Sequence, residues 1–187
     1  MAAHYSTLLI GGSGTIGSGL RTYLPRLDAR YHIVSLDLPG ARDKANEDEA
    51  QRAFVELDLC EDSEAFGTLL ADYDLVVYLA RKNPLQEMNA MTDLVFEAVL
   101  AQEKPPMIVA SSSVHAVDGL YSFDDEDSVY WPMADRNFDA VNPWPERISA
   151  KTPAHAPNDY AREKEYAEQW CQKMADRGHS AIAARWG

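Results

Sequence analysis

The chain has 187 residues, of which 46% are hydrophobic, so it is long enough for one domain with a sizeable core. Its formal net charge of −13 argues against binding to nucleic acid or to an anionic membrane, since both would repel it. There is no secretory signal pattern, no apolar run of membrane-spanning length, and no metal-site or disulfide spacing of its two cysteines. We therefore expect a cytoplasmic protein without a metal.

Short apolar runs alternate with longer helical segments along the whole chain. In chain order, the predicted elements are strand Thr7–Ile10, helix Gly14–Leu27, strands His32–Leu36 and Ala53–Leu57, helix Ser63–Ala71, strand Leu75–Leu79, helix Gln86–Gln102, strand Met107–Ala110, helix Asn158–Arg177 and strand Ala181–Arg185. Near-continuous apolar strands that alternate with helices are typical of a parallel sheet covered on both faces. The pattern predicts an α/β fold with a Rossmann-like, doubly wound parallel sheet in three α/β/α layers.

The first predicted strand runs into a glycine-rich turn, and residues 8–20 read LLIGGSGTIGSGL. Two phosphate-loop spacings fit it, because Gly14 and Gly17 complete G-x-G-x-x-G from Gly12 and G-x-x-G-x-x-G from Gly11. Such a turn lets backbone N–H groups approach a pyrophosphate, and the next helix presents its positive dipole end there. The loop residues that we expect at a cofactor are Gly11, Ser13, Gly14, Thr15, Ile16 and Gly17.

An acidic residue follows the glycine loop at the distance that a dinucleotide site requires. Asp37 closes the second predicted strand, twenty positions after Gly17. There its carboxylate can accept hydrogen bonds from the adenosine ribose hydroxyls, and its charge repels a 2′-phosphate. The order of strand, loop and acid therefore favours NAD over NADP, although the nearby Arg42 softens that preference.

The region from about 115 to 157 interrupts the alternation of strands and helices. A connection of this length is typical of a lid, a binding loop or disorder, and we interpret it as an insertion or lid loop. Its acidic run Asp124–Asp127 lacks the spacing of a calcium loop and is expected to be a solvated turn. Trp131 and Trp144 either stack on a sugar ring or pin the loop to the domain.

The spacing Tyr-x-x-x-Lys occurs twice, and only one of the two pairs can act together. Tyr78 and Lys82 straddle the end of a predicted strand, where four residues separate side chains by roughly 13 Å. Tyr160 and Lys164 fall in the helical stretch NDYAREKEYAEQW, capped by Asn158 or Asp159, where positions i and i+4 share one face.

The chemistry of the Tyr160–Lys164 pair would be proton transfer during hydride transfer, because a neighbouring ammonium stabilises a phenolate. The alternative is a surface helix in which Lys164 pairs with Glu163, Glu165 or Glu168.

A run of serines supports the catalytic interpretation. Met107–Ala110 leads directly into Ser111, Ser112 and Ser113. The carboxyl ends of central parallel strands line the crevice where α/β sheets bind ligands, so a serine there can hydrogen-bond the reacting oxygen of a substrate. The alternative is an ordinary polar turn.

Together, these motifs resemble the extended short-chain dehydrogenase/reductase family, and its NAD-dependent epimerase/dehydratase branch is the closer match. GGSGTIG is similar to the GGxGxIG loop of that branch. The resemblance implies that Tyr160 is the acid/base, that Lys164 holds the nicotinamide ribose, and that Ser112, or alternatively Ser113, contacts the substrate. It also implies cofactor contacts for Asp58 and Leu59 after the third strand, and for Leu79, Ala80 and Arg81, with arginine in place of the usual alanine.

A finer resemblance concerns the substrate. ASSSVHAVDG is similar to the A-S-S-N-H stretch of uronate dehydrogenases, in which an arginine at the place of Arg185 faces the substrate carboxylate. This implies a sugar or sugar acid as substrate. Family members continue into a smaller C-terminal part, so residues 1–187 are expected to be one NAD-binding domain that largely lacks it.

Two further expectations follow from the resemblance. A non-catalytic or truncated NAD-binding module with a sensing or regulatory role is the rival interpretation. A homodimer through the helices that carry Asn89 and Tyr160 is also implied, and the apolar positions Leu94, Val95, Ala98 and Val99 permit it or face the sheet instead.

Overall fold

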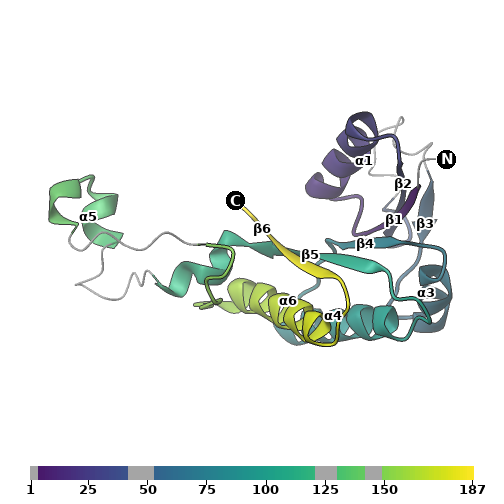
Figure 1. Ribbon diagram of the computed structural model, residues 1–187. Coiled ribbons are helices and arrows are strands. Elements are labelled where there is room, and N and C mark those ends of the chain that lie inside the picture. The colour runs from purple at the N-terminus through teal and green to yellow at the C-terminus, as the bar shows by residue number, and fades with distance from the viewer. Residues whose placement is uncertain (1–3, 42–52, 121–129, 142–148) are drawn as a thin grey trace.

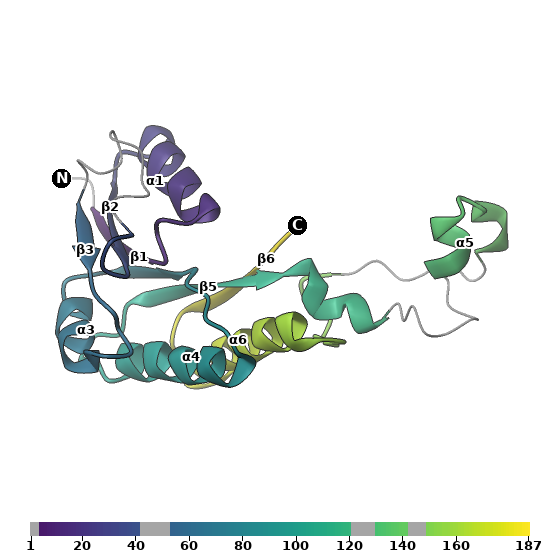
Figure 2. The same ribbon diagram turned by 180° about the vertical axis from the view of Figure 1, so that it is seen from behind.

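The computed structural model describes residues 4–41, 53–120, 130–141 and 149–187. These described residues form a parallel six-stranded sheet in the order β3-β2-β1-β4-β5-β6. The strands are β1 (Tyr5–Ile10), β2 (Tyr31–Asp37), β3 (Phe54–Glu56), β4 (Leu75–Tyr78), β5 (Met107–Ser113) and β6 (Ala181–Trp186). Helix α1 (Thr15–Leu27) lies on one face of the sheet, and α3 (Ser63–Leu70), α4 (Leu85–Leu100) and α6 (Asp159–Asp176) lie on the other (Figures 1 and 2). The prediction of a Rossmann-like, three-layer α/β fold is confirmed.

The main core lies between the sheet and the helices α3, α4 and α6. Alternate strand residues such as Leu8, Val76 and Ile108 are fully buried there, together with Phe66 and Phe96 of the helices. Burying each such side chain contributes about 1.5–3 kcal/mol, which explains why the strands read as near-continuous apolar runs.

The apolar residues that would permit a homodimer belong to this core. Val95 and Val99 are fully buried, and Leu94 and Ala98 pack against the same cluster. Val95 and Val99 therefore belong to the core, Leu94 and Ala98 are partly buried beside it, and the homodimer stays a prediction.

Helix α6 is held against α4 by aromatic and polar contacts. The rings of Phe96 and Trp170 stack with centroids 5.4 Å apart. Asp93 of α4 accepts hydrogen bonds from the Tyr166 hydroxyl at 2.6 Å and from Trp170 Nε1 at 2.8 Å. These contacts fix the helix that carries the Tyr-x-x-x-Lys motif relative to the sheet.

The strand order reverses between β1 and β4, which is the point where open α/β sheets bind ligands. The register pairs Ile10 with Leu36 on one side and with Tyr78 on the other. The glycine loop after β1, Asp37 at the end of β2 and the segment after β4 therefore meet at one edge of the sheet.

Strand β5 extends further than the sequence predicts. The strand was expected to end at Ala110, but it continues through Ser113, with Ser112 paired to Arg185 of β6. The alternative of a polar turn is therefore wrong, because β6 supplies a pairing partner for the serine backbone. The other predicted boundaries lie close to the observed ones.

The region around 115–157 contains the 3-10 helices η2 (Val114–Leu120) and η3 (Phe138–Ala140) and the short helix α5 (Tyr130–Ala134). Its two ends pair with each other, because Gly119 N donates to His155 O at 2.9 Å and His155 N donates to Ala116 O at 2.7 Å. Three positions considered in the sequence, Arg42, Asp124–Asp127 and Trp144, lie outside the described residues. Within the described ranges, no helix is both long and apolar enough to cross a membrane.

Candidate active site

The glycine loop after β1 is tightly packed on its neighbours. Gly11 has a φ of +80°, and a Cβ there would lie 2.5 Å from the backbone nitrogen of Ala80. A Cβ at Gly17 would collide with the carbonyl oxygen of Gly12. The buried Arg21 of α1 donates to that same carbonyl oxygen. These positions require glycine because the backbone passes too close to leave room for a side chain.

A cavity of about 370 Å³ opens beside this loop, at the carboxyl ends of β1, β2 and β4. Its wall contains these predicted cofactor residues: Gly11, Gly14, Asp37, Asp58, Leu59, Leu79, Ala80 and Arg81. Sequence reasoning assigned no cofactor contact to Cys60, Lys82 and Met91, which also line it. Ser13, Thr15, Ile16 and Gly17 belong to the loop and the start of α1 without lining the cavity.

Asp37 lies on the wall of this cavity, at the end of β2. Its Oδ2 accepts a hydrogen bond from Ser13 N at 3.0 Å, and its Oδ1 accepts one from Leu38 N at 2.9 Å. Each carboxylate oxygen keeps a free lone pair for a ligand hydroxyl. Within the described residues, the buried Ser13 Oγ has no hydrogen-bond partner. The Asp37 carboxylate in a largely apolar wall fits the adenosine half of NAD, and the Ser13 hydroxyl belongs to the glycine loop beside the cavity.

The two Tyr-x-x-x-Lys pairs differ as the sequence predicts. Tyr78 is 2% exposed, and its hydroxyl lies 3.1 Å from Thr92 Oγ1. Burial raises the pKa of Tyr78 well above its ordinary value. Lys82 Nζ instead lies 3.4 Å from Glu87 Oε2 near the surface. This pair cannot share a proton.

The second pair lies in the first two turns of α6. Asn158 caps the helix, its Oδ1 accepting a hydrogen bond from Ala161 N at 2.9 Å. Lys164 Nζ lies 5.4 Å from the centroid of the Tyr160 ring. The ring of His115 meets that of Tyr160 edge to face, with centroids 5.9 Å apart. Because both residues lie within α6 and are four positions apart, the predicted acid/base and its lysine lie on one face.

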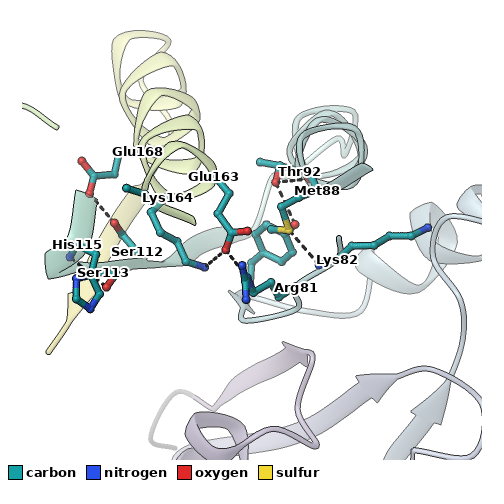
Figure 3. Close-up of polar contacts among 12 residues, drawn as sticks. Arg81, Lys82, Met88, Thr92, Ser112, Ser113, His115, Glu163, Lys164 and Glu168 are labelled. Carbon is teal, nitrogen blue, oxygen red and sulfur yellow. Dashed lines mark hydrogen bonds and ion pairs between the residues drawn. The ribbon is translucent and has the colours of Figure 1, made fainter. Parts of the chain in front are cut away.

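A buried carboxylate joins this pair to the cofactor cavity. Glu163 Oε1 accepts a hydrogen bond from Arg81 Nε at 2.7 Å and lies 3.1 Å from Lys164 Nζ (Figure 3). The guanidinium carbon of Arg81 lies 4.7 Å from the centroid of the Tyr160 ring. The sequence suggested Glu163 only as one of several partners for Lys164, and the contact with Arg81 links residues too far apart in the chain to be foreseen.

Ser112 and Arg185 meet at a second carboxylate. Glu168 Oε1 accepts hydrogen bonds from Ser112 Oγ at 2.5 Å and from Arg185 Nε at 2.7 Å, and Arg185 Nη2 reaches Glu168 Oε2 at 2.6 Å. Glu168 raises the pKa of the Arg185 guanidinium through these bonds. We call these three residues the Glu168 clip. Glu168 lies one helical turn after Lys164, and this spacing was the sequence signal that placed both residues on the same face of α6.

The two candidate serines differ in their surroundings. Figure 3 shows Ser112 directed toward Glu168 and Ser113 directed to the opposite side of β5. Ser113 Oγ accepts a hydrogen bond from His115 N at 3.2 Å. Ser112 and Arg185 are thus brought together with Glu168, whereas Ser113 lies next to the residue whose ring contacts Tyr160.

The switch-point cavity, the glycine loop and Asp37 define a dinucleotide-binding α/β protein. The family model described as "NAD dependent epimerase/dehydratase family" matches residues 7–186, so the chain belongs to that family. Membership confirms the resemblance seen in the sequence and the prediction of NAD as the cofactor. No curated protein matches the chain.

Several solved structures share the fold. The dTDP-glucose 4,6-dehydratase of Bacillus anthracis in complex with NAD is 17% identical, with a TM-score of 0.69 over 97% of this chain and 54% of its own. The UDP-Glc/GlcNAc 4-epimerase of Campylobacter jejuni is 20% identical, with a TM-score of 0.66 over 97% of this chain and 53% of its own. The uronate dehydrogenase of Agrobacterium tumefaciens is 22% identical, with a TM-score of 0.65. The match covers 96% of this chain and 59% of the dehydrogenase chain. The chain therefore spans about half the length of the solved structures that it matches.

Proposed function

We propose that the protein is an NAD-dependent oxidoreductase or epimerase that acts on a sugar or sugar acid by hydride transfer. The observation that carries this proposal is the Tyr160–Lys164 pair, which α6 presents beside the wall of the cofactor cavity. The neighbours named above include a sugar-nucleotide dehydratase, a sugar-nucleotide epimerase and a uronate dehydrogenase, which supports the substrate class.

In this proposal, each side chain has a defined task. Bound NAD supplies the hydride acceptor. The Tyr160 hydroxyl exchanges a proton with the substrate hydroxyl whose carbon is oxidised, and the ammonium of Lys164 stabilises the phenolate and binds the nicotinamide ribose. Ser112, or alternatively Ser113, donates a hydrogen bond to the reacting oxygen. Ser113 gains support from its contact with His115, because the His115 ring borders Tyr160.

The proposed substrate role of Arg185 requires a rearrangement. Its guanidinium is engaged by both oxygens of Glu168 and by the carbonyl oxygen of Thr152 at 2.8 Å. A substrate carboxylate that binds Arg185 Nε and Nη2 would have to replace Glu168, whereas the buried Nη1 has no hydrogen-bond partner among the described residues.

The proposal is tested by following NAD reduction with a panel of uronic acids and aldoses. We expect turnover of at least one substrate, and we expect Tyr160→Phe to lower kcat by at least a hundredfold while the Kd for NAD stays within threefold, since general acid/base catalysis contributes about 10²–10⁴-fold. Full activity of Tyr160→Phe on a confirmed substrate would contradict the proposed mechanism.

A second candidate is an NAD-binding module without catalysis, with a sensing or regulatory role. The engagement of Ser112 Oγ and of Arg185 Nε and Nη2 favours it, because these donors are then not available to a substrate. Tight NAD binding without turnover of any sugar or sugar acid in the panel would support this candidate.

A further inference from the structure

A buried carboxylate occupies the centre of the charged cluster between the cavity and Tyr160. Glu163 is 2% exposed, and the same oxygen atom contacts Arg81 Nε at 2.7 Å and Lys164 Nζ at 3.1 Å. The Tyr-x-x-x-Lys motif leaves the residue before the lysine unspecified, so the motif assigns Glu163 no role.

Charge balance makes these three side chains depend on one another. A carboxylate removed from water loses hydration that only close, hydrogen-bonded cations can offset. Conversely, the guanidinium of Arg81 and the ammonium of Lys164 would repel each other without the carboxylate between them. Lys164 is itself only 5% exposed, so water cannot replace Glu163 as the partner of its ammonium group.

The two cations also border the same aromatic ring. Arg81 Cζ lies 4.7 Å, and Lys164 Nζ 5.4 Å, from the centroid of Tyr160. Arg81 belongs to the wall of the cofactor cavity as well. Glu163 therefore ties the cavity wall, which follows β4, to the helix that carries the acid/base (Figure 3).

We propose that Glu163 is a positioning residue for the nicotinamide half of NAD. It holds Arg81 and Lys164 at the junction between the cavity and Tyr160, where the two cations would bind the nicotinamide ribose and the adjoining phosphate. This inference rests on the proposed function, which assigns Lys164 to that ribose. Glu163 acts through its two partners and exchanges no proton with the substrate.

The test compares a whole cofactor with its adenosine half on the full chain. Calorimetry measures the Kd of NAD and of AMP for the wild type and for Glu163→Gln, which keeps the shape of the side chain and removes its charge. We expect the Kd of NAD to rise about tenfold, because charge-assisted hydrogen bonds to the nicotinamide half lose their geometry. The Kd of AMP should stay within twofold, since AMP occupies only the cavity beside Asp37.

A matched control is Glu165→Gln, the same change two residues further along α6, which should leave both affinities within twofold. Equal weakening of NAD and AMP by Glu163→Gln would show a merely structural role and overturn the inference. It would also be overturned by unchanged NAD affinity in that variant, or by a wild-type chain that does not bind NAD. The proposed function fails separately if Tyr160→Phe keeps full activity, or if the wild type binds NAD without turning over any substrate. In both cases the comparison of the Kd values of NAD and AMP still tests the role of Glu163.

Discussion

The two halves of the candidate site are built in different ways. The half beside Asp37 is an open cavity whose shape comes from backbone turns, small residues and apolar strand ends. The half beside Tyr160 is a set of long charged side chains, held by the two buried or partly buried carboxylates of Glu163 and Glu168. The first half is therefore ready to receive a ligand as it stands, whereas the second must exchange some of its internal partners for those of a ligand.

The largest expected effect concerns the backbone-built half. Gly11→Ala should lower the free energy of unfolding by about 3 kcal/mol or more, because a left-handed backbone and a clash with Ala80 add together. The matched control is Gly19→Ala in α1, where a Cβ meets nothing within 4 Å. That change should stabilise the chain by about 0.5–1 kcal/mol, since alanine is the better helix former. Urea denaturation measures both, and equal effects of the two changes would contradict the packing described for the loop.

Next in size is the effect of breaking the Glu168 clip. Glu168→Gln should lower the free energy of unfolding by about 2–3 kcal/mol, because Arg185, only 16% exposed in its side chain, loses its charged partner. The control Arg162→Gln removes a pair on the same helix whose side chains are 58% and 73% exposed. It should change stability by less than about 1 kcal/mol. If Glu168→Gln were as stable as Arg162→Gln, the Glu168 clip would not stabilise the half of the site beside Tyr160.

The smallest of these effects concerns a single charge in the cavity. Asp37→Asn should raise the Kd of NAD about tenfold and narrow the preference for NAD over NADP, since the amide neither binds ribose hydroxyls as strongly nor repels a 2′-phosphate. Asp62→Asn, which changes the cap of α3 away from the cavity, should leave NAD affinity unaltered. If Asp37→Asn left the ratio of the Kd values for NAD and NADP unchanged, Asp37 would not contact the adenosine ribose.

Sequence reasoning succeeded where local rules decide the structure. Strand alternation, the glycine loop, Asp37 and the helical spacing of Tyr160 and Lys164 depend on neighbours close in the chain, and all of them were predictable. The separation of the two Tyr-x-x-x-Lys pairs followed from the same rules, because the position of Tyr78 on a strand already sets its side chain apart from Lys82.

Contacts between distant segments escaped prediction. Arg81 meets Glu163 across 82 positions of the chain, and Ser112 meets Glu168 across 56. Helical spacing puts Glu168 on the face of Lys164, but nothing local shows that Glu163 and Glu168, and not the half-buried Glu165, meet these distant partners. The extension of β5 through its serines has the same origin, since it depends on β6 lying alongside.

The most direct test of the account is a crystal structure of this chain with NAD. We expect one NAD molecule that spans both halves, with its adenosine ribose hydroxyls within hydrogen-bond distance of the Asp37 carboxylate and its nicotinamide ribose hydrogen-bonded to Lys164 Nζ. A nicotinamide ribose that lies away from Lys164 and Tyr160, with the adenosine still at Asp37, would contradict the claim that the two halves form one site.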